Sequence, residues 1–277
     1  MSRDYDAIVL DVDGTLLNDD SALPPRTQEA LQAAQGAGVV VMVATGRSDK
    51  TTAPVVREAG IEAPCVVYNG GGIYDAWQRR MLEQRHVPGR AVERLVAHAR
   101  ERGILPVVSR LEGHYAPTPR TSHQRRALSA YRVRMGLEAL PTREIHRITL
   151  ITAGHSGVGA LLVEVRQVLD TPAHLTYFSM KELPYLRDSP LHAVDVQPRC
   201  RGKAEAVRFL RERYGIPADR VVAVGDANND IEMLEAAGLG VAMGNASEDA
   251  LAAADRQIGD NNSDAVSQLI DELFLAP

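Results

Sequence analysis

The sequence predicts an α/β fold in which a parallel sheet forms the core and a smaller α+β domain is inserted into that core. Near both ends of the chain, short apolar runs alternate with stretches of helical period, which is typical of parallel sheets with helical crossovers. In the middle third, the alternation changes to a separate mixture of helical and extended segments. A length of 277 residues accommodates two such domains.

The core elements are expected in two blocks. The first holds a strand at residues 7–10, a helix at 24–34, a strand at 39–43, a helix at 48–59 and a strand at 65–68. The second holds a helix at 203–214, a strand at 221–224, a helix at 230–237, a strand at 240–243 and a last helix at 264–274. Helices of this length between strands are what parallel pairing requires.

The inserted domain is expected from Arg85 to Leu191, so that the core comprises residues 1–84 and 192–277. Helical stretches are expected at residues 92–101, 122–135 and 158–169, and extended segments at 105–109, 148–152 and 175–179. This span holds 15 Arg and 1 Lys against 9 Asp+Glu, a net charge of +7, which leaves −12 for the core. A positive field steers anions toward a site, although spread-out arginines also fit solvated helix faces.

The composition is that of an ordinary soluble globular protein, with 45% hydrophobic residues and a net charge of −5. The longest apolar run, residues 39–44, is far short of the ~20 residues that span a bilayer. Asp4 and Asp6 lie where a signal peptide would carry positive charge, so the expected location is cytoplasmic. Cys65 and Cys200 cannot form a disulfide framework and are expected to be small buried hydrophobes.

Two carboxylates follow the first strand, in the segment Asp11-Val12-Asp13-Gly14. Open parallel sheets bind ligands at the carboxyl ends of their strands, and repulsion between the two groups has to be relieved by a proton or a cation. The segment also fits a plain Asp-Gly turn. A calcium-binding loop is excluded because Ala22 stands where its twelfth position needs glutamate.

Two further strands end in polar segments. Thr45-Gly46-Arg47, ahead of a helix, offers a hydroxyl and an N–H group for a phosphate cradle, or simply leads into a helix cap at Ser48 or Asp49. The segment from Gly225 to Asp230 includes Asp226 and Asn229, oxygen ligands of the kind that suits Mg²⁺. Its alternative interpretation is a cap for the next helix.

Lys203 opens the helix that precedes the strand at 221–224. The chain has only three lysines, Lys50, Lys181 and Lys203, among 31 Lys+Arg. Most lysines are exposed to solvent. A lysine at this position of an arginine-rich chain favours a functional role, because its compact ammonium group could reach an anion near the strand ends.

The segment Gly154-His155-Ser156-Gly157-Val158-Gly159 has the look of a dinucleotide loop. Its spacing is G-x-x-G-x-G, and no acidic residue ends the next strand, at Ser179. A glycine-rich helix cap within the inserted domain is the favoured interpretation.

Taken in order, these four polar segments resemble the four motifs of the haloacid dehalogenase superfamily of phosphotransferases. The inserted domain resembles, in its position, its size and its α+β mixture of elements, the type IIB cap of the Cof-like sugar-phosphate phosphatases. In that family the cap is inserted into a Rossmann-like core. The tail, with Val241-Ala242-Met243-Gly244-Asn245-Ala246 and Asn261-Asn262-Ser263-Asp264, is similar to that branch. Ala204 and Ala265 replace glycines that are frequent in the family, and neither change removes a catalytic group.

The resemblance implies roles for the acidic residues. Asp11 would attack phosphorus and form an aspartyl-phosphate, and Asp13 would act as general acid and then general base. Mg²⁺ would be held by the carboxylates of Asp11 and Asp226 and by the main-chain carbonyl of Asp13, with Asp230 orienting that shell.

The resemblance also implies which residues hold the phosphoryl group, namely Thr45, the Gly46 N–H, Lys203 and Asn229. The Asn69-Gly70 turn is similar to one that lines the site in the family. The substrate would be a sugar phosphate or another small phosphorylated metabolite, and neither nucleic acid nor membrane is an expected partner. Substrate contacts in the inserted domain are expected from Arg110, His114, Tyr115, Lys181 and Arg187.

Three other functions compete with this prediction. A phosphohexomutase-like enzyme of the same superfamily shares the Asp-x-Asp core and the cap type. A P-type ATPase is disfavoured because the chain has no membrane segment and because Asp13 replaces the residue that preserves the aspartyl-phosphate there. A sugar-phosphate sensor without turnover is disfavoured by the intact set Asp11, Asp13, Lys203 and Asp226.

Overall fold

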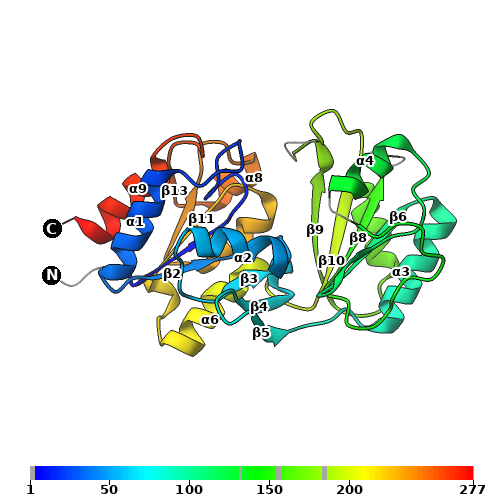
Figure 1. Ribbon diagram of the computed structural model, residues 1–277, viewed down its shortest axis with the longest axis horizontal. Helices are drawn as coiled ribbons and strands as arrows, with labels where there is room; N and C mark the ends of the chain where they lie inside the picture. Colours follow the sequence, from blue (N-terminus) through cyan, green and yellow to red (C-terminus); the bar gives the residue numbers. More distant parts are fainter. Residues whose placement is uncertain (1–3, 131–132, 154–157, 183–185, 277) are drawn as a thin grey trace. The chain divides into compact units, whose positions relative to one another are not determined.

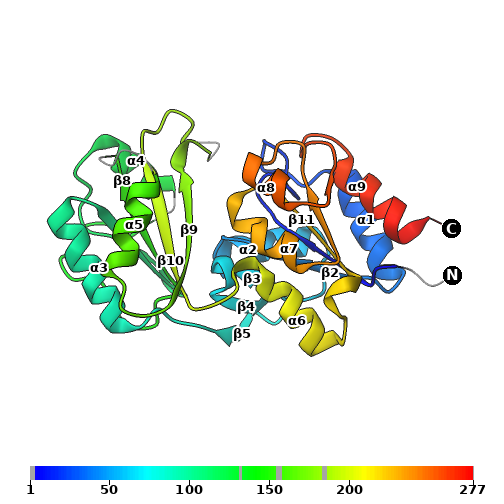
Figure 2. The same cartoon turned by 180° about the vertical axis from the view of Figure 1, so that it is seen from behind.

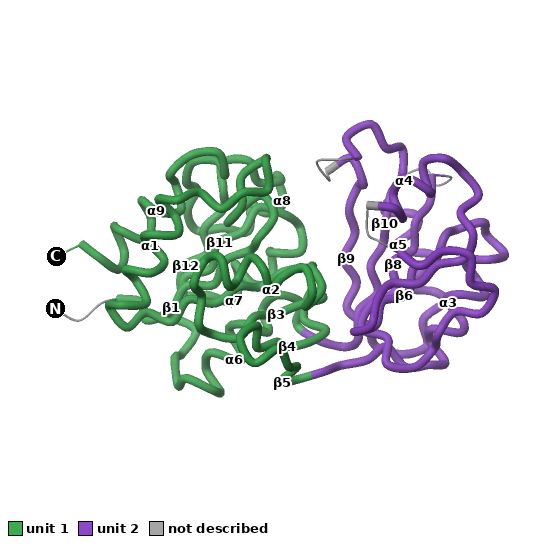
Figure 3. The backbone as a smooth tube through the Cα atoms, in the orientation of Figure 1, with its two compact units in different colours: residues 1–83, 201–277 green, residues 84–200 purple. Residues whose placement is uncertain are grey.

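The computed structural model describes residues 4–130, 133–153, 158–182 and 186–276. These form two compact units, one of residues 1–83 and 201–277 and the other of residues 84–200 (Figure 3). The first unit has a parallel sheet and the second a mixed α+β architecture, so the predicted fold class is confirmed.

The parallel sheet of the first unit has the strand order β13-β12-β11-β1-β2. Its strands are β1 (Ala7–Leu10), β2 (Val40–Val43), β11 (Val221–Gly225), β12 (Leu239–Ala242) and β13 (Arg256–Gln257). Its helices are α1 (Pro25–Gly36), α2 (Asp49–Glu58), α6 (Glu205–Tyr214), α7 (Ile231–Ala236), α8 (Glu248–Ala253) and α9 (Ala265–Ile270).

Strand β1 lies inside this sheet, between β11 and β2, and is buried along its whole length. It pairs in parallel with β2 on one side and β11 on the other, so that Leu10 lies between Val43 and Val224. Helices α1 and α9 cover one face of the sheet, and α6 and α7 cover the other (Figures 1 and 2). Burial on both faces explains why β1 reads as an unbroken apolar run.

A small second sheet extends the first unit. It comprises β3 (Cys65–Val67), β4 (Gly72–Asp75) and β5 (Arg80–Gln84) in the order β3-β4-β5. A bridge between Ala44 and Val66 joins the start of this sheet to the end of β2. The sequence analysis predicted β3 but no element over β4 or β5, and β5 alternates exposed with half-buried residues and has no apolar run.

The second unit is built on one five-stranded sheet with the order β7-β6-β8-β10-β9. Its strands are β6 (Leu105–Arg110), β7 (Gly113–Tyr115), β8 (Arg147–Thr152), β9 (Ala173–Ser179) and β10 (His192–Pro198). Its helices are α3 (Gly89–Arg102), α4 (Ser122–Ala130) and α5 (Val158–Val168). Apolar residues of α3 and α5 pack on one face, whereas α4 covers part of the opposite face.

The boundary expected at Leu191 is wrong for the strand that follows it. Strand β10 pairs antiparallel with both β8 and β9, so it belongs to the second unit, which continues to Cys200. Both hydrogen-bonding edges of β10 are therefore paired within the second unit, whereas the sequence analysis had assigned residues 192–200 to the core.

Two other expectations bear on the inserted unit. The helix expected at residues 122–135 is observed as α4 to Ala130, and residues 154–157 of the glycine-rich segment lie outside the described residues. No helix within the described ranges is both long enough and apolar enough to cross a membrane.

Candidate active site

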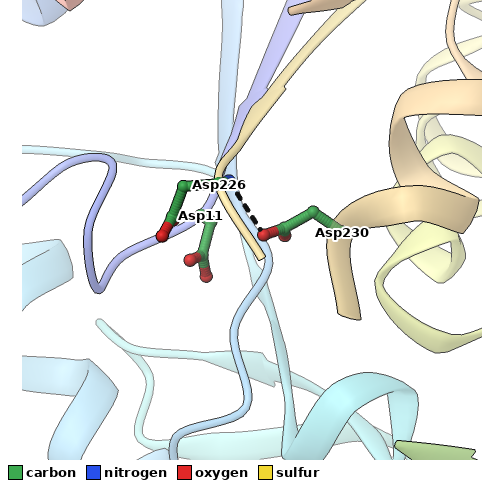
Figure 4. Close-up of side chains that lie close together, drawn as sticks. All are labelled: Asp11, Asp226 and Asp230. Atoms are coloured by element: carbon green, nitrogen blue, oxygen red, sulfur yellow. Dashed lines mark hydrogen bonds between the residues drawn. The ribbon is translucent and has the colours of Figure 1, made fainter. Parts of the chain in front are cut away.

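The first candidate residues lie where β1 and β11 end side by side. Asp11 follows β1, and its main-chain N–H donates to the carbonyl of Val224 at 3.0 Å. Asp226 follows Gly225, the last residue of β11. Parallel strands end at the same edge, so the two carboxylates lie together with that of Asp230, with one oxygen of each within 4.8 Å of the others (Figure 4).

Asp230 closes the loop that carries Asp226. It ends the 3-10 turn Asn228–Asp230. Its Oδ2 accepts the N–H of Asp226 at 3.1 Å (Figure 4) and the N–H of Ala227 at 3.0 Å. A Cβ on Gly225 would lie 2.5 Å from the Asp230 side chain, so only glycine allows this approach. Asp230 therefore shapes the loop while keeping its other oxygen free for Lys203.

Lys203 lies in the 3-10 turn Gly202–Ala204, just before α6. Its side chain is buried, and Nζ lies 2.7 Å from Asp11 Oδ1 and 2.7 Å from Asp230 Oδ1. Lys203 thus lies between Asp11, the predicted nucleophile, and Asp230, which was predicted to orient the metal ligands.

The charges of this cluster do not balance. Three buried or half-buried carboxylates, those of Asp11, Asp226 and Asp230, meet one ammonium group, Lys203, which leaves an excess of two negative charges when all are ionised. An all-oxygen cluster with that excess fits a hard divalent cation such as Mg²⁺. Two of the predicted metal ligands, Asp11 and Asp226, thus lie in an acidic cluster whose geometry and charge could hold such a cation.

The electrostatic consequences appear in the pKa values. Burial raises the pKa of Asp11 well above its usual range, and the charge of Lys203 offsets only part of this. Burial and the charge of Asp230 raise the pKa of Asp226 to about 7, against the hydrogen bond from the Thr15 hydroxyl at 2.8 Å. Burial lowers the pKa of Lys203, but the charges of Asp11 and Asp230 outweigh it and hold that pKa above its ordinary value. These charges therefore favour the protonated form of Lys203.

Asp13 differs from Asp11 in being largely exposed, with 59% of its side chain accessible. Arg47 binds both of its carboxylate oxygens, with Nε 2.7 Å from Oδ2 and a terminal nitrogen 2.5 Å from Oδ1. Gly14, the next residue, has a φ of +79°, and a Cβ there would lie 2.4 Å from Asp226 Oδ2. The turn that presents Asp13 consequently needs glycine.

The predicted phosphoryl-binding residues gather around Asn69. Thr45 is buried, and its hydroxyl accepts the N–H of Arg47 at 3.1 Å. A Cβ on Gly46 would come within 3.1 Å of the Asn69 amide, and Asn229 Nδ2 donates to Asn69 Oδ1 at 3.1 Å. Thr45, Gly46 and Asn229 are therefore brought together, while Lys203 reaches the same region from the carboxylate side.

Sequence reasoning assigned no role to several residues that complete this site. They are Thr15, which bonds Asp226, Arg47, which binds Asp13, and Asn245, which donates to the carbonyl of Gly14 at 2.9 Å. Arg47 was detectable because it directly follows the Thr-Gly pair. The partners of Thr15 and Asn245 are 211 and 231 residues away, and no local pattern encodes them.

The substrate residues expected in the inserted domain all belong to the second unit. Arg110 pairs with Glu112 at 3.1 Å and with Glu144 at 2.6 Å, and its neighbours on the β6–β7 hairpin, His114 and Tyr115, contact Ser109 and Arg134 respectively. These partners make Arg110 a surface ion-pair residue in this structure. Lys181 and Arg187 are exposed.

A buried ion pair in this unit escaped the sequence analysis. Asp195 on β10 lies 3.3 Å from Arg147 on β8 and accepts the hydroxyl of Thr149 at 2.5 Å. Burial raises the pKa of Asp195, which the charge of Arg147 opposes. The pair was missed because β10 had been placed in the core.

Comparison with known proteins identifies the class. Residues 8–270 match the model of a family described as haloacid dehalogenase-like hydrolases. The chain is 26% identical to the 5-amino-6-(5-phospho-D-ribitylamino)uracil phosphatase YitU of Bacillus subtilis, covering 96% of this chain and 97% of the relative. It is 29% identical to the pyridoxal phosphate phosphatase YbhA of Escherichia coli, covering 95% and 96%.

A solved structure agrees in fold. The sugar phosphatase BT4131, described as a subclass IIB member of the superfamily, superposes with a TM-score of 0.79 at 22% identity, covering 97% of this chain and 98% of that one. The chain therefore belongs to the haloacid dehalogenase-like hydrolases. The predictions that it belongs to the Cof-like branch and that it is a phosphatase are confirmed.

Proposed function

We propose that this protein hydrolyses small phosphomonoesters in the presence of Mg²⁺, through an aspartyl-phosphate formed on Asp11. The observation that carries the proposal is the buried cluster of Asp11, Asp226, Asp230 and Lys203 at the carboxyl edge of the sheet. Its two excess negative charges match a divalent cation, and its one lysine supplies the donor that phosphoryl transfer requires.

Asp11 is the nucleophile in this proposal. One carboxylate oxygen attacks phosphorus and displaces the alcohol, which splits hydrolysis into the formation and the breakdown of an acyl phosphate. Lys203, fixed between Asp11 and Asp230, keeps its proton and neutralises charge on the phosphoryl oxygens. Mg²⁺, held by Asp11, Asp226 and the Asp13 carbonyl, supplies further neutralisation when bound.

Asp13 is the general acid and general base. It protonates the leaving alcohol in the first half-reaction and removes a proton from water in the second. Arg47 donates one hydrogen bond to each of its oxygens, and each oxygen keeps a second lone pair that can carry the transferred proton. Arg47 thus holds Asp13 in a defined starting position.

Thr45, the Gly46 N–H and Asn229 bind the phosphoryl group. Their common packing on Asn69 supports this assignment. Because hydrogen-bond donors fixed by the fold need no reorganisation during the reaction, they stabilise the transferring group more than mobile donors do.

The substrate is a small phosphorylated metabolite, such as a sugar phosphate. The names of the two curated relatives each specify a phosphorylated small molecule, with different bodies. Arg110, His114, Tyr115, Lys181 and Arg187 remain the proposed contacts to that body, and the net charge of +7 in residues 85–191 favours a substrate with a second negative group.

The test is phosphate release from a panel of phosphomonoesters, with Mg²⁺ and with chelator. The wild type should release phosphate only with the metal, and Asp11→Asn should abolish release because an amide cannot attack phosphorus. With Asp13→Asn, intact-mass spectrometry should find one added phosphoryl group, and peptide mass spectrometry should place it on Asp11. Label on any other residue, transfer between sugar positions without net release, or a wild type inactive across the panel would each contradict the proposal.

A further inference from the structure

Two residues next to the predicted phosphoryl-binding loop hold an unusual backbone conformation. Tyr68 has a φ of +55° and Asn69 a φ of +49°, and Gly70 follows with +90°. Glycine adopts such angles freely and asparagine tolerates them, but a bulky aromatic residue rarely does. A backbone of this kind persists only where the surroundings enforce it, and such positions concentrate at functional sites.

A buried hydrogen bond enforces this conformation. The Tyr68 side chain is 1% exposed, and its hydroxyl donates to Asp49 Oδ1 at 2.9 Å. Asp49 is the first residue of α2 and is itself buried. Asp49 and Tyr68 come from the two sides of the Thr45–Arg47 loop, one following it in sequence and the other reaching it from the end of β3. A bond from a hydroxyl to a carboxylate is stronger than one between neutral groups.

The main chain of the same two residues fixes the loop directly. The N–H of Tyr68 donates to the carbonyl of Arg47 at 2.9 Å, and the N–H of Asn69 donates to the carbonyl of Thr45 at 3.0 Å. These two carbonyls flank Gly46, whose Cα lies so near the Asn69 amide that a Cβ would be 3.1 Å away. The left-handed turn therefore sets the position of the N–H group proposed to bind the phosphoryl oxygen.

The side chain of Asn69 also binds the loop that follows β11. Its Oδ1 accepts Asn229 Nδ2 at 3.1 Å, across 160 residues of sequence. Asn229 Oδ1 is buried and has no hydrogen-bond partner among the described residues. The Asn69 bond uses one hydrogen of Asn229 Nδ2 and fixes the orientation of that amide, so the second Nδ2 hydrogen is the donor assigned to a phosphoryl oxygen.

We propose that Tyr68, anchored by Asp49, is a positioning residue for phosphoryl transfer, and that through Asn69 it sets the distance between the Gly46 N–H and the Asn229 amide. The inference rests on the proposed function and deepens it. Tyr68 does not touch the reacting atoms. It acts by holding two donors on different strand ends in one geometry, and a small displacement of such donors weakens transition-state binding strongly.

The test compares Tyr68→Phe with Tyr74→Phe. Tyr74 is buried in the adjacent strand β4, and removing its hydroxyl breaks none of the hydrogen bonds described above. Tyr68→Phe should lower kcat/KM by roughly 10- to 100-fold, whereas Tyr74→Phe should stay near the wild type. The inhibition constant of orthovanadate, which imitates the transferring phosphoryl group, should rise by a similar factor in Tyr68→Phe, with the Mg²⁺ activation constant unchanged.

A merely structural role would give a different result. Loss of folded protein lowers the active fraction but leaves the vanadate inhibition constant as it was, so that outcome overturns the inference. Asp49→Asn keeps an oxygen that accepts the tyrosine hydroxyl and should retain more activity than Asp49→Ala. The double variant of Asp49→Ala with Tyr68→Phe should be no worse than Asp49→Ala alone, because both remove one bond, and additive losses would refute the anchor.

The proposed phosphatase function and the positioning role of Tyr68 can be refuted independently of each other. A wild type without phosphatase activity removes the proposed function, but stabilisation by orthovanadate with Mg²⁺, measured as a rise in Tm, still reports the phosphoryl site. If that rise is as large in Tyr68→Phe as in the wild type, or if kcat/KM is unchanged in an active enzyme, Tyr68 has no positioning role.

Discussion

Replacing Lys203 with methionine removes the one positive charge of the carboxylate cluster while keeping most of the buried volume. Nζ lies 2.7 Å from an oxygen of Asp11 and 2.7 Å from an oxygen of Asp230. At an effective dielectric constant of about 20, each of these pairs attracts by about 6 kcal/mol before desolvation is counted. Desolvation of the ammonium offsets most of this attraction.

The net change in stability depends on the carboxylate charges that Lys203→Met leaves without a partner. Removing one member of a buried ion pair typically costs about 3–5 kcal/mol, because the remaining charge has no partner. We therefore expect the free energy of unfolding of metal-free Lys203→Met to fall by about 3–5 kcal/mol. Addition of Mg²⁺ should restore part of it, since the cation neutralises the same carboxylates. The loss of a phosphoryl donor should lower kcat by roughly 10²- to 10³-fold.

Urea unfolding followed by circular dichroism, with and without Mg²⁺, measures the first effect and steady-state kinetics the second. Lys50→Met is the matched control, because Lys50 is exposed in α2 and should change neither quantity. If metal-free Lys203→Met unfolds at the same urea concentration as the control, the cluster does not depend on Lys203, and the charge argument is wrong.

Three further results are expected. Gly14→Ala should raise the Mg²⁺ activation constant at least about tenfold, because a Cβ 2.4 Å from Asp226 Oδ2 displaces that carboxylate; metal titration of activity measures it. Arg47→Lys should lower kcat by about tenfold while changing the free energy of unfolding by less than about 1 kcal/mol, because its pair with Asp13 is largely exposed. Burial raises the pKa of Cys65 to about 12, so iodoacetamide at pH 8 should modify half-exposed Cys200 first, as peptide mass spectrometry would show.

Each of these has an outcome that contradicts it. Gly215 has a φ of +70° in open space, so Gly215→Ala carries a similar backbone penalty; an equal change in metal activation there would mean that backbone strain alone explains Gly14→Ala. An Arg47→Lys variant with unaltered kcat would show that Asp13 does not need the two-pronged contact. Equal alkylation rates for both cysteines in the native protein would contradict the burial of Cys65.

The sequence by itself determined the fold class and the main acidic site. Strand β1 had to be an apolar run because it is buried on both faces, and parallel pairing with β11 then placed Asp11 and Asp226 at one edge. Lys203 was found because lysine is rare in this chain. These features are local, since a strand end and the residue that follows it can be read from adjacent positions.

Tertiary structure alone decided which side chains meet across long separations. Arg47 binds Asp13, and Asn69 links Gly46 to Asn229. The local sequence around each of these residues does not predict which distant residue it contacts. The position of β10 between β8 and β9 in the second sheet could not be predicted either, because the neighbours of an antiparallel strand depend on the path of the whole chain. The hydrophobic pattern of a segment predicts which of its residues are buried. Contacts between distant segments depend on how the whole chain packs, so they cannot be read from one segment.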